Sequence, residues 1–159
     1  MILIGFLILL TGGGFLAWIS GRWSSLIPRI IGLTVTAVQF CAAVVLWLIH
    51  RDLPLSQEWI VSYTREWIPV FGIQFKLAAD GLSLLMIVLT SFLGMISVLA
   101  SWKSIRKRAG FFHFNLMLIL AGITGVFVAL DLFLFYFFWE LMLIPMYFLI
   151  SIWGYENRN

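Results

Sequence analysis

Long apolar stretches occupy most of the chain, and they constrain its fold more than any other feature of the sequence. The longest runs from Phe112 to Trp153 without a hydrophilic loop. A helix crosses a membrane with about 20 apolar residues, so this stretch is too long for one crossing and has to turn back on itself. The turn is expected at residues 129–131, where Asp131 can cap the helix that follows.

The composition also indicates membrane insertion. Of the 159 residues, 63% are hydrophobic and only 11% are charged. In soluble domains about 25% of the residues are charged. The sequence therefore predicts an all-α integral membrane protein of about five transmembrane helices, with residues 1–159 forming a single membrane domain. The expected spans are residues 2–20, 28–49, 81–102, 112–130 and 131–153, and residues 50–80 are expected to form an outer loop.

The first two spans each contain a feature that bears on helix packing. The three residues Gly12–Gly14 provide either a flat surface for close helix approach or a soft, kinked point. Gln39 lies in the middle of the second span, and we expect an interhelical hydrogen bond from it, because an amide cannot carry a proton. The N-terminus at Met1 lacks the basic residues of a signal peptide, so a retained helix is expected there.

The outer loop carries charges of both signs and two prolines. Every second residue from Phe71 to Leu77 is apolar, which is typical of a half-buried strand, and pairing with residues 59–64 would make a hairpin. At the end of the loop the Asp80 carboxylate is expected to accept a hydrogen bond from the N–H of Ser83 and to cap the third span.

One face of the third span is small and polar. It is interpreted as a tight packing seam or, alternatively, as a water-lined path. The residues of this face are Ser83, Thr90, Gly94, Ser97 and Ser101.

The basic residues are distributed unevenly between the two ends of the predicted helices. Alternating sides for successive loops puts seven on one side and three on the other, and the positive-inside rule makes the first side cytoplasmic. The N-terminus is then expected outside and the C-terminus in the cytoplasm. These charges give no nucleic-acid signal, and the single Cys41 excludes a disulfide within the chain. The seven are Arg22, Arg29, Lys103, Arg106, Lys107, Arg108 and Arg158, and the three are Arg51, Arg65 and Lys76.

Glu140 interrupts the apolar run from Phe135 to Tyr147. Counted from Asp131 at about 1.5 Å per residue, it lies roughly 13 Å into its helix, near the middle of a ~30 Å hydrocarbon core. A charge there costs at least about 2.5 kcal/mol, so the default interpretation is a proton or ion site that faces other helices and not lipid. The alternative is a protonated, structural glutamate that donates one interhelical hydrogen bond.

Four further residues are candidates to support Glu140. Pro145 has no N–H, which frees a carbonyl beside Glu140, should kink or loosen the helix, and can recruit water. Tyr136 and Tyr147 share the face of Glu140 as hydrogen-bond partners, or else they are interfacial or core aromatics. His113 is either an interfacial anchor or a relay that passes protons inward from the adjacent basic loop.

Three stretches carry a family resemblance: residues 80–86 (DGLSLLM), residues 110–117 (GFFHFNLM) and residues 138–147 (FWELMLIPMY). They resemble the antiporter-like subunits of proton-pumping NADH:quinone oxidoreductase (respiratory complex I), most closely the M type, also called chain 4. The resemblance implies that Glu140 is the proton carrier of the family's channel. Family members carry many more helices, and one of these later helices holds a lysine that pairs with this glutamate. This chain is therefore expected to be a fragment, a split subunit or a truncated product.

The implied function is that of the N-terminal part of a proton-translocating subunit, which couples quinone reduction elsewhere to proton transfer through Glu140. Such a subunit belongs to an enzyme but has no redox centre and no complete active site. No cofactor or metal is expected in this chain, and NADH, flavin, iron–sulfur clusters and quinone are expected in other subunits. The implied partners are other membrane subunits of complex I, including neighbouring antiporter-like subunits, and the lipid of a bacterial inner membrane. Two alternatives are a D-type subunit of a multisubunit cation/proton antiporter and a non-conducting truncated scaffold.

Overall fold

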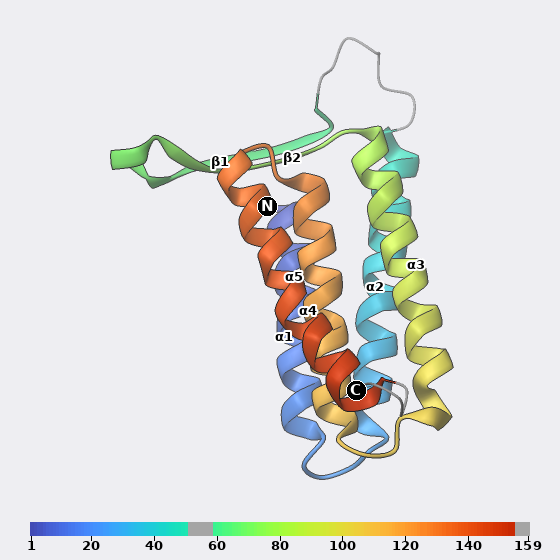
Figure 1. Cartoon of the computed structure of the whole chain (residues 1–159). Coiled ribbons are helices and arrows are strands. Elements are labelled where there is room, and N and C mark those ends of the chain that lie inside the picture. The colour runs from blue at the N-terminus through green and yellow to red at the C-terminus, as the bar shows by residue number, and fades with distance from the viewer. Residues whose placement is uncertain (51–58, 155–159) are drawn as a thin grey trace.

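The computed structural model describes residues 1–50 and 59–154, and within them five helices are long and apolar enough to cross a membrane. The helices lie side by side, with α2 and α3 adjacent to each other and α4 next to both α1 and α5 (Figure 1). The prediction of a five-helix membrane protein is thereby confirmed. The bounds are α1 (Ile2–Ser20), α2 (Ile27–His50), α3 (Gly81–Ser104), α4 (Ala109–Val128) and α5 (Leu132–Trp153).

The turn between α4 and α5 lies where the sequence predicts it. Oδ1 of Asp131 accepts hydrogen bonds from the backbone N–H of Phe133 (2.9 Å) and of Leu134 (3.2 Å). The start of α4 differs from the expectation, because the helix begins at Ala109 and not at residue 112. The residue before it, Arg108, has a left-handed backbone with φ 53°, so the chain turns sharply out of the short loop after α3.

The expected hairpin is present and adds a two-stranded sheet to the helices. Strand β1 (Val61–Ile68) pairs antiparallel with β2 (Ile73–Ala79), so β1 extends beyond the expected residues 59–64. The expected strand start at Phe71 is wrong, because Pro69 opens a short 3-10 helix, η1 (Pro69–Phe71), that joins the two strands. The other part of the expected outer loop, residues 51–58, lies outside the described residues.

The hairpin lies across one end of the helices and fixes the turn that precedes α5 (Figure 1). Leu77 of β2 is fully buried and pairs with Ala129, and the N–H of Leu130 donates to the Lys76 carbonyl (3.0 Å). The Trp67 ring contacts the rings of Phe133 and Phe137 of α5, with centroids 5.8 Å apart in each pair. The hairpin thus positions the first turns of the helix that carries Glu140.

Small residues bring the helices together. A methyl group on Gly13 would lie 2.6 Å from Val35 of α2, and one on Gly14 would lie 3.1 Å from Met117 of α4. Helix α1 continues without interruption through both glycines. The close contacts of Gly13 and Gly14 confirm the flat-surface interpretation at these two residues, whereas a methyl group on Gly12 would meet nothing within 4 Å.

The small, polar face of α3 is a packing seam. Thr90, Gly94 and Ser101 are buried, and a methyl group on Gly94 would lie 2.7 Å from Leu120 of α4. The hydroxyls of Thr90 and Ser101 donate to carbonyls of their own helix, at 2.7 and 2.9 Å. Ser97 is exposed and does not take part in the seam. The close packing at Gly94 favours the seam over the water-lined path.

Candidate functional site

Glu140 lies on the outer face of α5. Its side chain is exposed, and no hydrogen bond or ion pair joins it to another residue in the described part of the chain. The buried residues of α5 are Leu134, Phe138 and Pro145, which point away from Glu140 toward the other helices. In an apolar stretch of 18 residues, only 17% of the residues are buried in α5, against 50% in α4. The described helices therefore leave the face around Glu140 uncovered.

The two predicted tyrosine partners share this outer face. Tyr136 is 59% exposed and Tyr147 is 68% exposed, one turn before and two turns after Glu140. No hydrogen bond links either hydroxyl to Glu140 within the described residues. The structure therefore aligns the three polar groups along one stripe of α5, separated by apolar residues.

Pro145 lies on the opposite, buried side of α5. The helix runs from Leu132 to Trp153 without a break (Figure 1). A proline lacks the N–H that would bond to the carbonyl of Leu141, and this carbonyl belongs to the residue next to Glu140. The loss of this backbone hydrogen bond at Pro145 therefore does not interrupt helix α5.

His113 is fully buried in the interface between α4 and α2. Its Cδ2 atom would lie 2.9 Å from a methyl group on Gly32. Nδ1 lies 2.8 Å from the carbonyl oxygen of Ala109, and a carbonyl only accepts, so Nδ1 carries the proton. Nε2 is then an acceptor, and it has no partner among the described residues. This burial contradicts the interpretation of His113 as an interfacial anchor.

A buried cation accompanies His113, and it did not stand out in the sequence. Arg29 of α2 is 9% exposed, and its Nη2 donates to the carbonyl of Ile105 (2.8 Å). Its Nε–H has no partner among the described residues, and Gly32, one helical turn further along α2, packs against the His113 ring. Arg29 lies one helical turn before Gly32, which is the only signal in the sequence that could have linked it to this interface.

The basic residues separate between the two ends of the bundle as predicted. The loops after α1 and after α3 lie at one end, and the hairpin lies at the other (Figure 1). Of the ten basic residues, Arg51 and Arg158 lie outside the described residues. Across residues 1–50 and 59–154, no group of three or more His, Cys, Asp or Glu side chains could hold a metal ion.

Comparisons with known proteins connect these features to a family. The family described as NADH:quinone oxidoreductase/Mrp antiporter, transmembrane region, matches residues 129–159, which include all of α5. NADH-quinone oxidoreductase subunit M of Escherichia coli (strain K12) is 49% identical over 152 residues, which cover 92% of this chain and 30% of that protein. The subunit M of Pseudomonas aeruginosa is 47% identical over 153 residues, with the same coverage.

More distant proteins also match this chain. NAD(P)H-quinone oxidoreductase chain 4 of Thermosynechococcus vestitus is 36% identical over 132 residues, covering 82% of this chain and 24% of that protein. The solved structure of the membrane-bound sulfane sulfur reductase, an archaeal respiratory membrane complex, contains a chain that matches with a TM-score of 0.74 and 23% identity. The match covers 92% of this chain and 22% of that chain. This chain thus spans about 30% of the length of the two M subunits named above.

Proposed function

Because this chain is homologous to the N-terminal part of the M subunits of NADH-quinone oxidoreductase, we propose that it forms part of a proton-translocating membrane subunit of that enzyme. The observation that carries the proposal is the position of Glu140. It is the one carboxylate within the apolar helix α5, it lies inside the segment that the family matches, and the described helices leave it uncovered.

In this proposal Glu140 carries the proton. The relatives are more than three times as long as this chain, and further helices from the longer protein or from neighbouring subunits would cover the outer face of α5. A cation on a covering helix favours the ionised carboxylate, and its withdrawal favours the protonated one. Movement of that cation, driven by quinone reduction in other subunits, would make Glu140 release and take up a proton.

The other predicted site residues have supporting roles. Tyr136 and Tyr147 lie along the stripe of Glu140, where their hydroxyls can hydrogen-bond water that reaches the carboxylate. The Leu141 carbonyl, left without the Pro145 N–H, is an acceptor for the same water. His113, with its unpartnered Nε2, would take up protons from the basic end of the bundle.

The homology supports a bacterial inner membrane as the location of the protein. The uneven distribution of the basic residues supports an N-terminus outside and a C-terminus in the cytoplasm. Its partners would be neighbouring antiporter-like subunits, and NADH, flavin, iron–sulfur clusters and quinone would be bound by other subunits of the complex.

The decisive experiment is Glu140→Gln in the assembled complex. The amide keeps the shape and the hydrogen bonding of the side chain but cannot ionise, so we expect normal assembly and a sharp loss of proton pumping and of coupled quinone reduction. Glu66→Gln on the exposed hairpin is the matched control and should leave both activities unchanged. Normal pumping by an assembled Glu140→Gln complex would instead support the non-conducting scaffold.

A D-type subunit of a multisubunit cation/proton antiporter is the second candidate, because the description of the matching family includes Mrp antiporters. The two candidates differ in what drives transport. Membranes that contain the complex would pump protons upon NADH addition under the first, and would exchange sodium for protons without NADH under the second. Sodium-dependent exchange that disappears in Glu140→Gln would favour the antiporter.

A further inference from the structure

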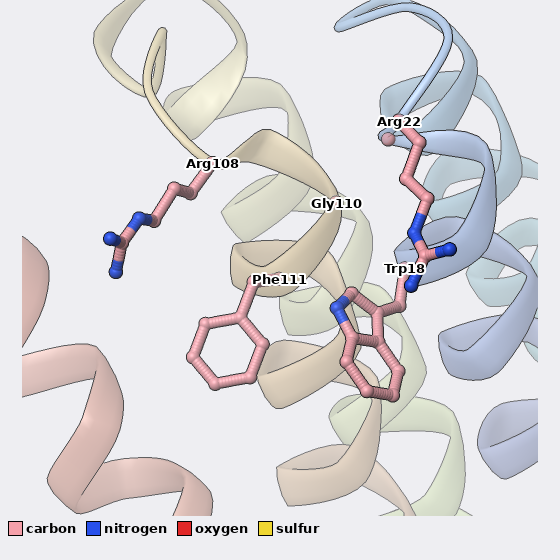
Figure 2. Close-up of a pocket in the computed structure, with 6 residues that line it drawn as sticks. Trp18, Arg22, Arg108, Gly110 and Phe111 are labelled. Carbon is pink, nitrogen blue, oxygen red and sulfur yellow. The ribbon is translucent and has the colours of Figure 1, made fainter.

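A pocket of about 380 Å³ opens at the basic end of the bundle, where α1 ends and α4 begins. It is separate from Glu140 and from the His113 interface, and the proposed function does not use it. Figure 2 shows its walls. The lining residues are Trp18, Gly21 and Arg22 from the end of α1, and Arg108, Gly110 and Phe111 from the start of α4.

The floor of the pocket is backbone. A methyl group on Gly21 would lie 2.6 Å from Cα of Gly110, and one on Gly110 would lie 2.8 Å from the carbonyl oxygen of Ala17. No side chain fits between the two segments at this point. The two glycines therefore bring the end of α1 against the start of α4 and keep the space above them open.

The walls of the pocket are positively charged. Arg22 and Arg108 are exposed and lie on opposite sides of Gly110 (Figure 2). Neither guanidinium forms an ion pair or hydrogen bond with a residue in the described part of the chain. The start of α4 adds to this charge, because no side chain caps its first backbone amides.

Aromatic rings continue from the pocket into the apolar part of the bundle. The rings of Trp18 and Phe111 lie 6.4 Å apart at the pocket, and Trp18 is 44% exposed. Phe114 follows at 5.4 Å from Trp18, and Phe15, which is 50% exposed, lies 5.1 Å from Phe114. Tryptophan at the end of a spanning helix is typical of the membrane–water interface, so this row of rings descends from headgroup depth toward the acyl chains.

We propose that this pocket binds an anionic glycerophospholipid, with its headgroup at the rim that carries Arg22 and Arg108 and an acyl chain along Trp18, Phe114 and Phe15. Arginine pairs with phosphate through two parallel hydrogen bonds, and basic pockets between spanning helices attract anionic headgroups. A soluble phosphate would satisfy the same arginines. The aromatic row favours the lipid, because a soluble anion makes no use of an apolar surface that continues into the bilayer.

The test uses the full-length protein, purified with its partner subunits and reconstituted into phosphatidylcholine vesicles. The vesicles contain a small fraction of diazirine-labelled phosphatidylglycerol or, in a parallel sample, diazirine-labelled phosphatidylcholine. After illumination, mass spectrometry quantifies lipid attached to the peptides that contain Trp18 and Phe111. We expect these peptides to be labelled selectively by phosphatidylglycerol.

The double variant Arg22→Gln/Arg108→Asn should lower this selectivity about 25-fold, since each arginine that lines the pocket is expected to contribute roughly a fivefold preference for the anionic headgroup bound there. Asparagine is used at position 108 because it tolerates the left-handed backbone there. Arg106→Gln/Lys107→Gln removes the same charge from neighbouring residues that do not line the pocket, and should retain the selectivity. The single variant Arg22→Gln, at a side chain with no hydrogen bond or ion pair among the described residues, should lower it about fivefold.

Four results would overturn the proposal. The first is an equal loss of selectivity in the two double variants, which would mean that the charge of the whole loop region attracts the lipid. The second is equal labelling by both lipids, and the third is an unchanged selectivity in Arg22→Gln. The fourth is loss of labelling when inorganic phosphate is added at constant ionic strength, which would make a soluble anion the ligand.

Discussion

Nε2 of Gln39 in α2 lies 3.3 Å from Oγ1 of Thr124 in α4, and each of these two side chains is only 1% exposed. This is the interhelical hydrogen bond expected of Gln39. It joins two helices in the middle of the apolar region, where water cannot replace a lost partner. Oε1 of Gln39 has no partner among the described residues, so the amide already depends on this single bond.

Thr124→Val should destabilise the protein by about 0.6 kcal/mol, the average for interhelical hydrogen bonds in membranes, and by no more than about 1.7 kcal/mol, the largest value for such bonds. The side chain keeps its shape, so the loss reports the bond to Gln39. Unfolding in mixed micelles with increasing denaturing detergent measures the difference. Thr34→Val is the control, because Thr34 is exposed and its hydroxyl donates only to carbonyls of its own helix. With Gln39→Leu as background, Thr124→Val should become nearly neutral.

Gly125→Ala should separate α4 from α5. A methyl group at Gly125 would overlap with the ring of Phe138, which is buried and cannot move aside. We expect a loss of about 1–3 kcal/mol in stability, as for other overpacked sites. Gly12→Ala is the matched control, because nothing lies within 4 Å of its added methyl group. A neutral Gly125→Ala would show that α5 does not dock on α4 as described here.

The cap of α3 should make stability depend on pH. The Ser83 N–H donates to Oδ1 of Asp80 over 2.7 Å, and this hydrogen bond holds the pKa of the Asp80 carboxyl below its ordinary value of 3.8. Because the folded-state pKa is lowered, the stabilisation is present above the ordinary value and is lost as the pH falls through the folded-state value. Asp80→Asn keeps a capping side chain that does not titrate, so its unfolding midpoint should change less in acid. Equal acid sensitivity of the two proteins would contradict this role.

The orientation is tested with single cysteines in a Cys41→Ala background. Ser104→Cys, at the end of α3, should react with a membrane-impermeant maleimide only from the cytoplasmic side. Ser62→Cys, exposed on β1, should react only from the outer side. The positive-inside distribution of Arg and Lys is the physical reason. Labelling with the opposite sidedness would reverse the proposed topology.

The structure confirms the predictions of features that depend on a few residues close together in the sequence. The caps at Asp80 and Asp131 each depend on one side chain and the amides two or three residues later. The hairpin depends on alternating residues and on a turn at Pro69 and Gly72. The error at Phe71 has the same origin, since the apolar alternation continued into residues whose backbone Pro69 turns away from the strand.

The sequence predicted five apolar helices long enough to cross a membrane, the ends of these helices to within a few residues, and the single carboxylate within α5. The length of an apolar run and the residues at its ends settle these properties, because the bilayer thickness and the backbone hydrogen bonds act on each helix separately. The packing of the helices against one another sets the rotation of each helix about its axis. It turned Glu140 outward, buried His113 beside Arg29, and opened the pocket above Gly21 and Gly110. Those outcomes depend on contacts between residues far apart in the chain, which helical spacing within one segment does not specify.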